Sequence, residues 1–270
     1  MLDCAEGVQV GLRKMRLNIS NIQAIFLTHM HGDHVFGLIG LLSTLGLLGR
    51  QQQLHIYGPA PLQNIFQPQI DYFCADSPFE IMLHEIDSQV PQTVYEDRSV
   101  TISTIPLSHR VKCCGYMLKE KQTSPHIKRD MIDYFNIPIS QINNIKAGAD
   151  WTLDDGTVVP NCRLTTPAAP ARSYAYCTDT KYRPDIAELI PNANCLYHEA
   201  TFSQEHMLLA KKTFHSTAEQ AAHIAQAAHV YQLVIGHFSS RYNDENLLLE
   251  EAKTVFPNTI LANEGMKIKL

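Results

Sequence analysis

The sequence lacks the features of a secreted, membrane or disordered protein. No basic segment followed by an apolar stretch opens the chain, so we expect no secretory leader. No apolar run is long enough to span a bilayer, and the Leu- and Gly-rich segment 35–48 instead predicts a buried helix. Charged residues make up only 18% of the 270 residues and hydrophobic residues 45%, which predicts a large core and little disorder.

Cysteine pairs of the kind that build disulfide frameworks or zinc ribbons are also missing. The chain has seven cysteines, an odd number, and no C-x-x-C spacing. Reduced thiols in a cytoplasmic protein are the simplest interpretation.

An excess of basic residues, common in nucleic-acid enzymes, is absent as well. The formal net charge is −5, which argues weakly against a nucleic-acid substrate. Phosphate binding needs only a local positive patch, however, and bound divalent cations would add charge that a residue count omits.

Strand and helix patterns alternate along most of the chain, which predicts a layered α/β (α+β) fold. Apolar runs predict strands at 22–27, 54–57, 80–86, 173–177, 195–197 and 232–235, and a hairpin at 93–107. Helices are expected at 36–48, 61–72, 216–228 and 243–255, the third opened by a capping box from Ser216 to Glu219. Segment 119–172 has few strand signals and one helical stretch, 127–135, and is interpreted as an inserted arm.

A dense group of metal-ligand residues follows the first strand. Alternate side chains of an extended segment face the same way, so His29 and His31 can converge on one ion. The chain turns at Gly32, which directs Asp33 and His34 to a neighbouring ion. Imidazole and carboxylate ligands suit Zn, Mn or Fe, and a pair of such ions can clamp a phosphodiester. The alternative is a polar loop with incidental histidines.

Three further candidates follow later apolar runs: His109, Asp179 and His237. Each histidine alone would be read as an ordinary core or surface residue. Taken together, the three complete a two-metal site that the first motif leaves open, and Asp179 is the best bridging ligand because a carboxylate can give one oxygen to each ion.

Several motifs together resemble ribonuclease Z of the metallo-β-lactamase superfamily. They are LDCAEG, THMHGDH with its Leu/Gly-rich helix, SHR, CTDT, HEATF, HSTAEQAA and GHFSSRY, and their order and spacing match over nearly the whole chain. The resemblance implies one domain over 1–270, a four-layer αββα sandwich of two facing mixed sheets, with the arm at 119–172 as a tRNA-binding exosite. It also implies a homodimer that acts on precursor tRNA, with no membrane or DNA partner.

The resemblance implies a role for each site residue. Two Zn²⁺ ions, with Mn²⁺ as the alternative, would be held by His29, His31 and His109 and by Asp33, His34 and His237, with Asp179 bridging. A metal-activated hydroxide would attack the phosphorus, with Asp33 orienting it or accepting its proton. Glu199 would hold His215 protonated to donate to the leaving 3′ oxygen, so that the 3′ trailer is removed and the tRNA keeps a 3′-hydroxyl.

Phosphate contacts are expected both at the site and on the arm. Arg241 offers a guanidinium fork, although a salt bridge is the competing interpretation. The backbone N–H groups of Ser216 and Thr217 at a helix start would favour a phosphate. The competing interpretation of the Glu199–His215 pair is that His215 merely caps that helix and Glu199 pairs at the surface. The candidates on the arm are Lys119, Lys121, Lys128 and Arg129, whose alternative is a solvated helical face.

Two departures from the family pattern leave other functions open. Family members carry further residues before the LDC motif that form the first strands, so we expect those strands to be missing here and a sheet edge to be exposed. The arm also lacks the Gly-Pro signature of many members. The alternatives are a hydrolase of small phosphodiesters or sulfate esters, or a truncated relative that binds RNA without cutting it.

The remaining histidines are not expected to take part in the site. His198 is expected to face away from Glu199, and no role is assigned to His55, His84, His126, His206, His223 or His229.

Overall fold

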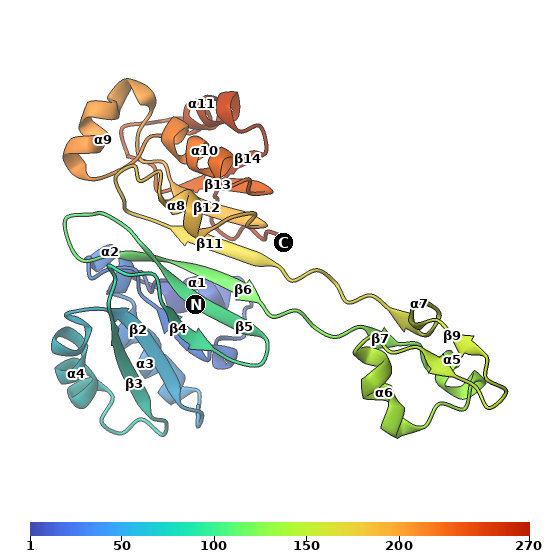
Figure 1. Ribbon diagram of the computed structural model, residues 1–270. Coiled ribbons are helices and arrows are strands. Elements are labelled where there is room, and N and C mark those ends of the chain that lie inside the picture. The colour runs from blue at the N-terminus through green and yellow to red at the C-terminus, as the bar shows by residue number, and fades with distance from the viewer. The chain divides into compact units, whose positions relative to one another are not determined.

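The computed structural model describes all 270 residues, which form two compact units. The first unit contains residues 1–119 and 173–270, and the second contains residues 120–172. Figure 1 shows the elements of both.

One sheet of the first unit is wholly parallel. Its strands are β1 (Ala24–Phe26), β2 (Leu54–Pro59) and β3 (Ile81–Ile86), in that spatial order. Helices α1 (Val8–Lys14), α3 (Leu38–Leu47) and α4 (Leu62–Phe73) accompany it (Figure 1). The expectation of two mixed sheets is therefore wrong for this one, because α3 and α4 are crossover helices that return the chain to the same end of the sheet.

The second sheet has seven strands in the order β14-β13-β12-β11-β6-β5-β4. They are β4 (Thr93–Glu96), β5 (Val100–Pro106), β6 (Cys114–Glu120), β11 (Ser173–Cys177), β12 (Cys195–Glu199), β13 (Gln232–Gly236) and β14 (Thr259–Leu261). Strands β11 to β14 are parallel, whereas β6 runs antiparallel to β11. The outer face of this seven-stranded sheet packs on α8 (Ile186–Leu189), α10 (Ala218–Ala227) and α11 (Asn246–Val255). The remaining helices of this unit are α2 (Gly32–Val35), α9 (Met207–Thr213), η1 (Ile19–Asn21) and η2 (Gln204–His206).

Alternation along β1 divides the core into layers. Ile25 and Leu27 are buried in the cluster that holds α3 and α4. Phe26 points the other way, into a cluster with Tyr116 of β6, and the two ring centroids are 5.4 Å apart. A third cluster lies between the second sheet and its helices. These layers confirm the predicted αββα sandwich.

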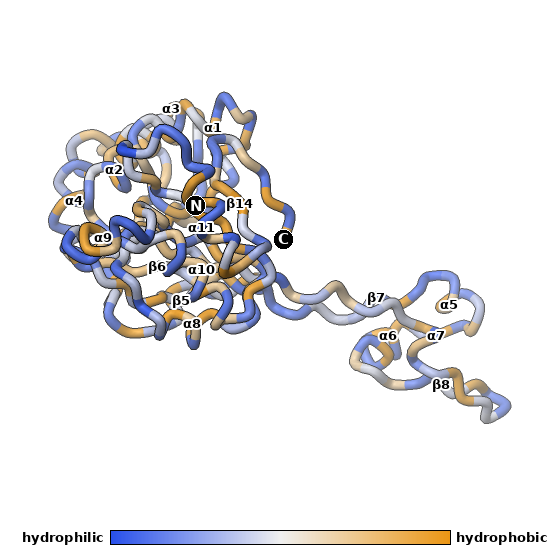
Figure 2. Tube along the Cα trace, turned by 90° about the horizontal axis from the view of Figure 1, so that it is seen from above, coloured by the Kyte–Doolittle hydropathy of each residue, from blue (hydrophilic) through white to orange (hydrophobic).

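The second unit has a small core of its own. Its elements are β7 (His126–Ile127), α5 (Arg129–Tyr134), α6 (Ile139–Lys146), β8 (Trp151–Thr152), β9 (Val158–Val159), α7 (Asn161–Leu164) and β10 (Thr165–Thr166). Apolar residues recur along its trace (Figure 2), and the buried ones are Ile137, Ile145, Val159 and Leu164. Helix α6 was not predicted, and neither were α1, β6 and β14.

The N-terminus of α10 corrects one sequence prediction. The capping box is formed by Thr217 and Gln220, one residue later than predicted from Ser216 and Glu219. The Ser216 hydroxyl instead donates to the carbonyl of Thr180 at 2.7 Å. None of the helices is long and apolar enough to cross a membrane.

Candidate active site

Strand ends bring the predicted ligands to one region. His29 and His31 follow β1, and Asp33 and His34 lie in α2. Gly32 opens that helix, and a Cβ atom there would come within 2.3 Å of the exposed ring of Phe36, which would have to move. The other three, His109, Asp179 and His237, follow β5, β11 and β13.

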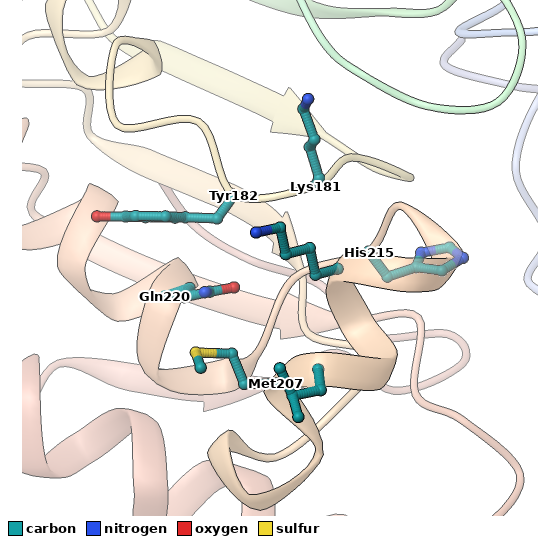
Figure 3. Close-up of a pocket in the computed structure, with 7 residues that line it drawn as sticks. Lys181, Tyr182, Met207, His215 and Gln220 are labelled. Carbon is teal, nitrogen blue, oxygen red and sulfur yellow. The ribbon is translucent and has the colours of Figure 1, made fainter.

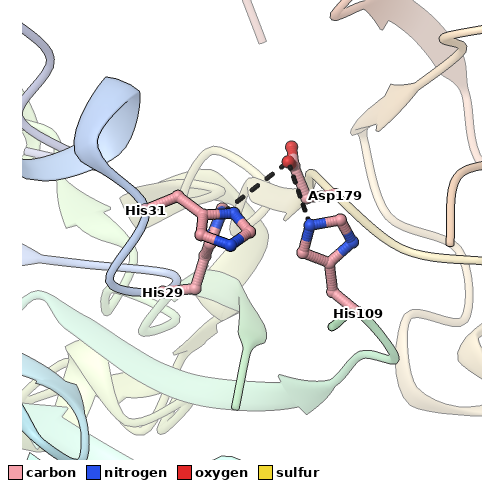
Figure 4. A group of neighbouring side chains, drawn as sticks. All are labelled: His29, His31, His109 and Asp179. Carbon is pink, nitrogen blue, oxygen red and sulfur yellow. Dashed lines mark hydrogen bonds and ion pairs between the residues drawn. The ribbon is translucent and has the colours of Figure 1, made fainter. Parts of the chain in front are cut away.

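The first cluster contains His29, His31, His109 and Asp179, whose ligand atoms all lie within 4.8 Å of one another (Figure 4). His29 Nε2 and His31 Nδ1 are 3.0 Å apart. Asp179 Oδ2 lies 3.7 Å from His29 Nε2 and 3.8 Å from His109 Nε2. Four ligand atoms thus surround one position.

The second cluster contains Asp33, His34 and His237, again within 4.8 Å. Asp179 Oδ1 lies 3.6 Å from His34 Nε2 and 3.3 Å from His237 Nε2. One oxygen of the Asp179 carboxylate therefore faces each cluster. This is the arrangement that a carboxylate shared by two ions requires.

Hydrogen bonds at Nδ1 orient four of the five imidazoles and leave Nε2 directed at the clusters. The partners are Thr28 Oγ1 for His29 (3.0 Å), Asp3 Oδ2 for His34 (2.8 Å), the Phe214 carbonyl for His109 (3.0 Å) and Thr201 Oγ1 for His237 (2.8 Å). Because the Thr28 and Thr201 hydroxyls donate their own protons to carboxylates, they accept from the rings. The Nε2 lone pairs of these rings are thereby available to a cation.

Asp3 is a functional residue that the sequence analysis missed. Its buried carboxylate accepts hydrogen bonds from His34 Nδ1 (2.8 Å), the Thr28 backbone N–H (2.7 Å) and the Tyr176 hydroxyl (3.4 Å). Its backbone is left-handed, with φ of 49°, a conformation that Asp tolerates better than most residues. Asp3 lies in the LDC motif, which entered the sequence analysis only through the family resemblance. The carboxylate in that motif was the one signal that could have predicted a residue that orients a ligand.

Protonation states suit a divalent cation. Burial and the neighbouring imidazoles lower the pKa of His29 to about 3, so that ring is neutral near pH 7. Burial alone would raise the pKa of Asp179, but His237, His34 and His29 lower it well below its ordinary value. At His34, burial alone would lower the pKa, but the hydrogen bond and charge of Asp3 raise it, so a cation must displace a proton from that ring. Imidazole nitrogens around an ionised carboxylate are the donor set that zinc takes in proteins, so the residues fit such ions.

Glu199 and His215 form a pair beside these clusters. His215 Nδ1 lies 2.8 Å from Glu199 Oε1. Glu199 is fully buried, and its carboxylate accepts further hydrogen bonds from the N–H groups of Thr180 (2.9 Å), Thr201 (3.1 Å) and Ser216 (3.1 Å). Burial alone would lower the pKa of His215, but the hydrogen bond and charge of Glu199 raise it above its usual value.

Members of both clusters and His215 line one cavity of about 370 Å³. Its lining residues are His31, Asp33, His109, Arg110, Asp179, Thr201, Phe202, Thr213, His215 and His237. At its edge, Arg241 Cζ lies 5.2 Å from the centroid of the Phe202 ring, and Arg241 Nε donates to Ser239 Oγ at 3.2 Å. Arg241 forms no ion pair, so the salt-bridge alternative is wrong.

Hydrogen bonds within the fold occupy the backbone N–H groups at the start of α10 and the ring of His198. The N–H groups of Ser216 and Thr217 are not free for a phosphate, because they donate to Glu199 Oε2 and to Gln220 Oε1 (both 3.1 Å). His198 is fully buried, its Nδ1 lies 2.7 Å from the Glu199 carbonyl oxygen, and it belongs to neither ligand cluster.

The predicted arm residues lie apart from this site along the chain. Lys119 is in β6, Lys121 follows it, Lys128 is the N-cap of α5 and Arg129 is its first residue. Lys128 Nζ donates to the Arg163 carbonyl at 3.1 Å within the second unit.

An αββα sandwich with histidines and aspartates at its strand ends defines a metallo-β-lactamase-fold hydrolase. A beta-lactamase superfamily domain model matches residues 1–127. The chain is 52% identical to ribonuclease Z of Bacteroides thetaiotaomicron over all of its 270 residues, which cover 85% of that protein. It is 46% identical to ribonuclease Z of Porphyromonas gingivalis, covering 89% of it. The crystal structure of human tRNase Z, short form, superposes with a TM-score of 0.68 at 25% identity, over 99% of this chain and 86% of that one. The chain belongs to the ribonuclease Z family.

Proposed function

We propose that this enzyme removes the 3′ trailer from precursor tRNA and leaves a 3′-hydroxyl on the tRNA. The observation that carries the proposal is that His215, held by the buried Glu199, lines the same cavity as members of both ligand clusters. The names of its relatives, ribonuclease Z and tRNase Z, support an RNA substrate.

Two divalent cations, Zn²⁺ by default and Mn²⁺ as the alternative, are the implied cofactors. His29, His31 and His109 would hold one and Asp33, His34 and His237 the other, with one Asp179 oxygen for each. When bound, they supply Lewis-acid activation of water and neutralise phosphate charge.

The chain's own groups complete the reaction. Asp33, whose side chain is 69% exposed, would orient the attacking water and accept its proton. His215, held through Nδ1 by Glu199, donates from Nε2 to the leaving 3′ oxygen, since its raised pKa favours the protonated ring. Arg110 and Arg241 lie at the cavity and its edge, where unpaired guanidinium groups can bind the phosphates on either side of the cut.

The arm, the assembly and the compartment complete the proposal. The arm at 119–172 is the candidate exosite for tRNA, with Lys119, Lys121, Lys128 and Arg129 contacting phosphates. We propose a homodimer in which the arm of one subunit serves the active site of the other, located in the cytoplasm.

The test is cleavage of a precursor tRNA with a 3′ trailer by the purified chain supplied with Zn²⁺ or Mn²⁺. A His31→Ala variant is the control, and the metal content of both proteins is measured. We expect a cut just after the discriminator base that is lost in the variant. An uncut precursor with two ions bound per chain would refute the proposed substrate and favour a small phosphodiester, whereas a chain that binds no metal would refute the proposed cofactor.

A further inference from the structure

A second cavity adjoins the active site and shares one residue with it. Its volume is about 410 Å³, and its lining residues are Lys181, Tyr182, Met207, Leu208, Lys211, His215 and Gln220 (Figure 3). Only His215 also lines the active-site cavity, and none of the other six belongs to the ligand clusters. The two cavities therefore lie on either side of His215, the residue proposed above to donate to the leaving oxygen.

Positive charge in this second cavity is not neutralised by the protein. Lys181 and Lys211 are both exposed, and neither forms an ion pair. By contrast, the nearby Arg183 is paired with Asp185. Lys181 Nζ lies instead 6.0 Å from the centroid of the Phe214 ring. On a chain of net charge −5, two unpaired ammonium groups in one cavity favour an anionic ligand.

The other lining groups suit a nucleobase. Tyr182 is 37% exposed, Met207 40% and Leu208 79%, so aromatic and apolar surface is available for stacking. Gln220 Oε1 accepts the Thr217 N–H, which leaves the amide nitrogen of Gln220 free to donate. Stacking on an aromatic ring is open to every base and needs no particular sequence.

We propose that this cavity binds the 3′-terminal nucleotide of the tRNA product, with its 5′-phosphate at Lys181 and Lys211 and its base against Tyr182. The inference rests on the proposed function. In an in-line displacement the attacking and leaving oxygens lie on opposite sides of the phosphorus. The attacking water belongs to the cavity of the ligand clusters, so the nucleotide that keeps the leaving oxygen extends from His215 into the other cavity.

Cleavage kinetics of precursor tRNA test the charge contacts. The Lys181→Ala/Lys211→Ala double variant is expected to raise KM about ten-fold, and to lower the slope of log(kcat/KM) against log[salt] by about one for each lysine. Hydrolysis of bis(p-nitrophenyl) phosphate, which has no such nucleotide, should be unchanged. Lys212→Ala is the matched control, since Lys212 is an exposed neighbour on α9 that does not line the cavity. A double variant with the KM and salt slope of the wild type would overturn the inference.

Crosslinking tests the location directly. A tRNA product with 4-thiouridine as its 3′-terminal nucleotide should crosslink to a peptide containing Tyr182 or residues 207–211. A crosslink confined to the peptides of Arg110 or Phe202 would overturn the assignment. Because this probe is not cleaved, it tests the cavity separately from catalysis. An enzyme that leaves precursor tRNA uncut would refute the proposed function, whatever the crosslink shows.

Discussion

Replacing Asp3 by Asn changes one atom of the carboxylate that holds His34. Asp3 Oδ1 accepts the Thr28 backbone N–H at 2.7 Å, and Oδ2 accepts from His34 Nδ1 at 2.8 Å. The backbone donor cannot change, so the amide oxygen stays with Thr28 and the amide NH₂ faces His34. The ring must then carry its proton on Nε2, the atom that lies 3.6 Å from Asp179 Oδ1. The lone pair needed for a cation is lost.

The affinity for a metal ion at the cluster of Asp33, His34 and His237 is expected to fall about 10- to 100-fold, which corresponds to about 1.4 to 2.7 kcal/mol of binding free energy. The cluster of His29, His31 and His109 should be nearly unaffected, because the Thr28 hydroxyl can still donate to the amide oxygen. Chelator competition monitored by metal content measures both affinities. Tyr176→Phe is the matched control, since it removes only a 3.4 Å hydrogen bond to the same carboxylate. Wild-type affinity at both sites, or an equal loss at both, would refute the reasoning.

Three further predictions separate catalysis, stability and substrate binding. His215→Ala should lower kcat for precursor tRNA about 10²- to 10⁴-fold while two ions remain bound; a loss of metal, as expected for His237→Ala, would instead make His215 a ligand. Thr217→Ala should cost about 1 kcal/mol of unfolding free energy, or about 2 °C in Tm, because the capping box is lost. Glu219→Ala should change the unfolding free energy by no more than about 0.5 kcal/mol in the same thermal melts. A larger loss for Glu219→Ala than for Thr217→Ala would contradict the assigned cap. Arg129→Glu should lower kcat/KM for precursor tRNA but not for bis(p-nitrophenyl) phosphate, and equal effects on both substrates would exclude an exosite role.

The strongest sequence predictions concern residues joined by short-range geometry. His29, His31, Asp33 and His34 lie within six residues of one another at a strand end, so strand alternation and one turn suffice to bring them together. The same logic placed the later candidates, because carboxyl ends of parallel strands meet at one edge of a sheet. The αββα layers could be predicted as well, mainly through the resemblance to a known family.

Weak local signals explain most of the errors. Helix α6 is only eight residues long and most of them are polar, and β6 contains a glycine and charged residues that are not typical of a strand. The capping box was predicted one residue too early because Ser216 and Thr217 are both good N-cap residues. Only tertiary contacts decide between them: the Ser216 hydroxyl is already engaged by the Thr180 carbonyl.

The sequence alone determined which side chains could bind metal, since their residue types and their positions after strands are local properties. Only the tertiary structure decided how those side chains are oriented. Asp3 reaches His34 across 31 residues and Tyr176 across 173, and Thr201 reaches His237 across 36. The cavity with Lys181 and Lys211 likewise joins a loop after β11 to α9. Hydrogen bonds and cavities between distant segments depend on packing of the whole fold, and no spacing rule along the chain encodes them.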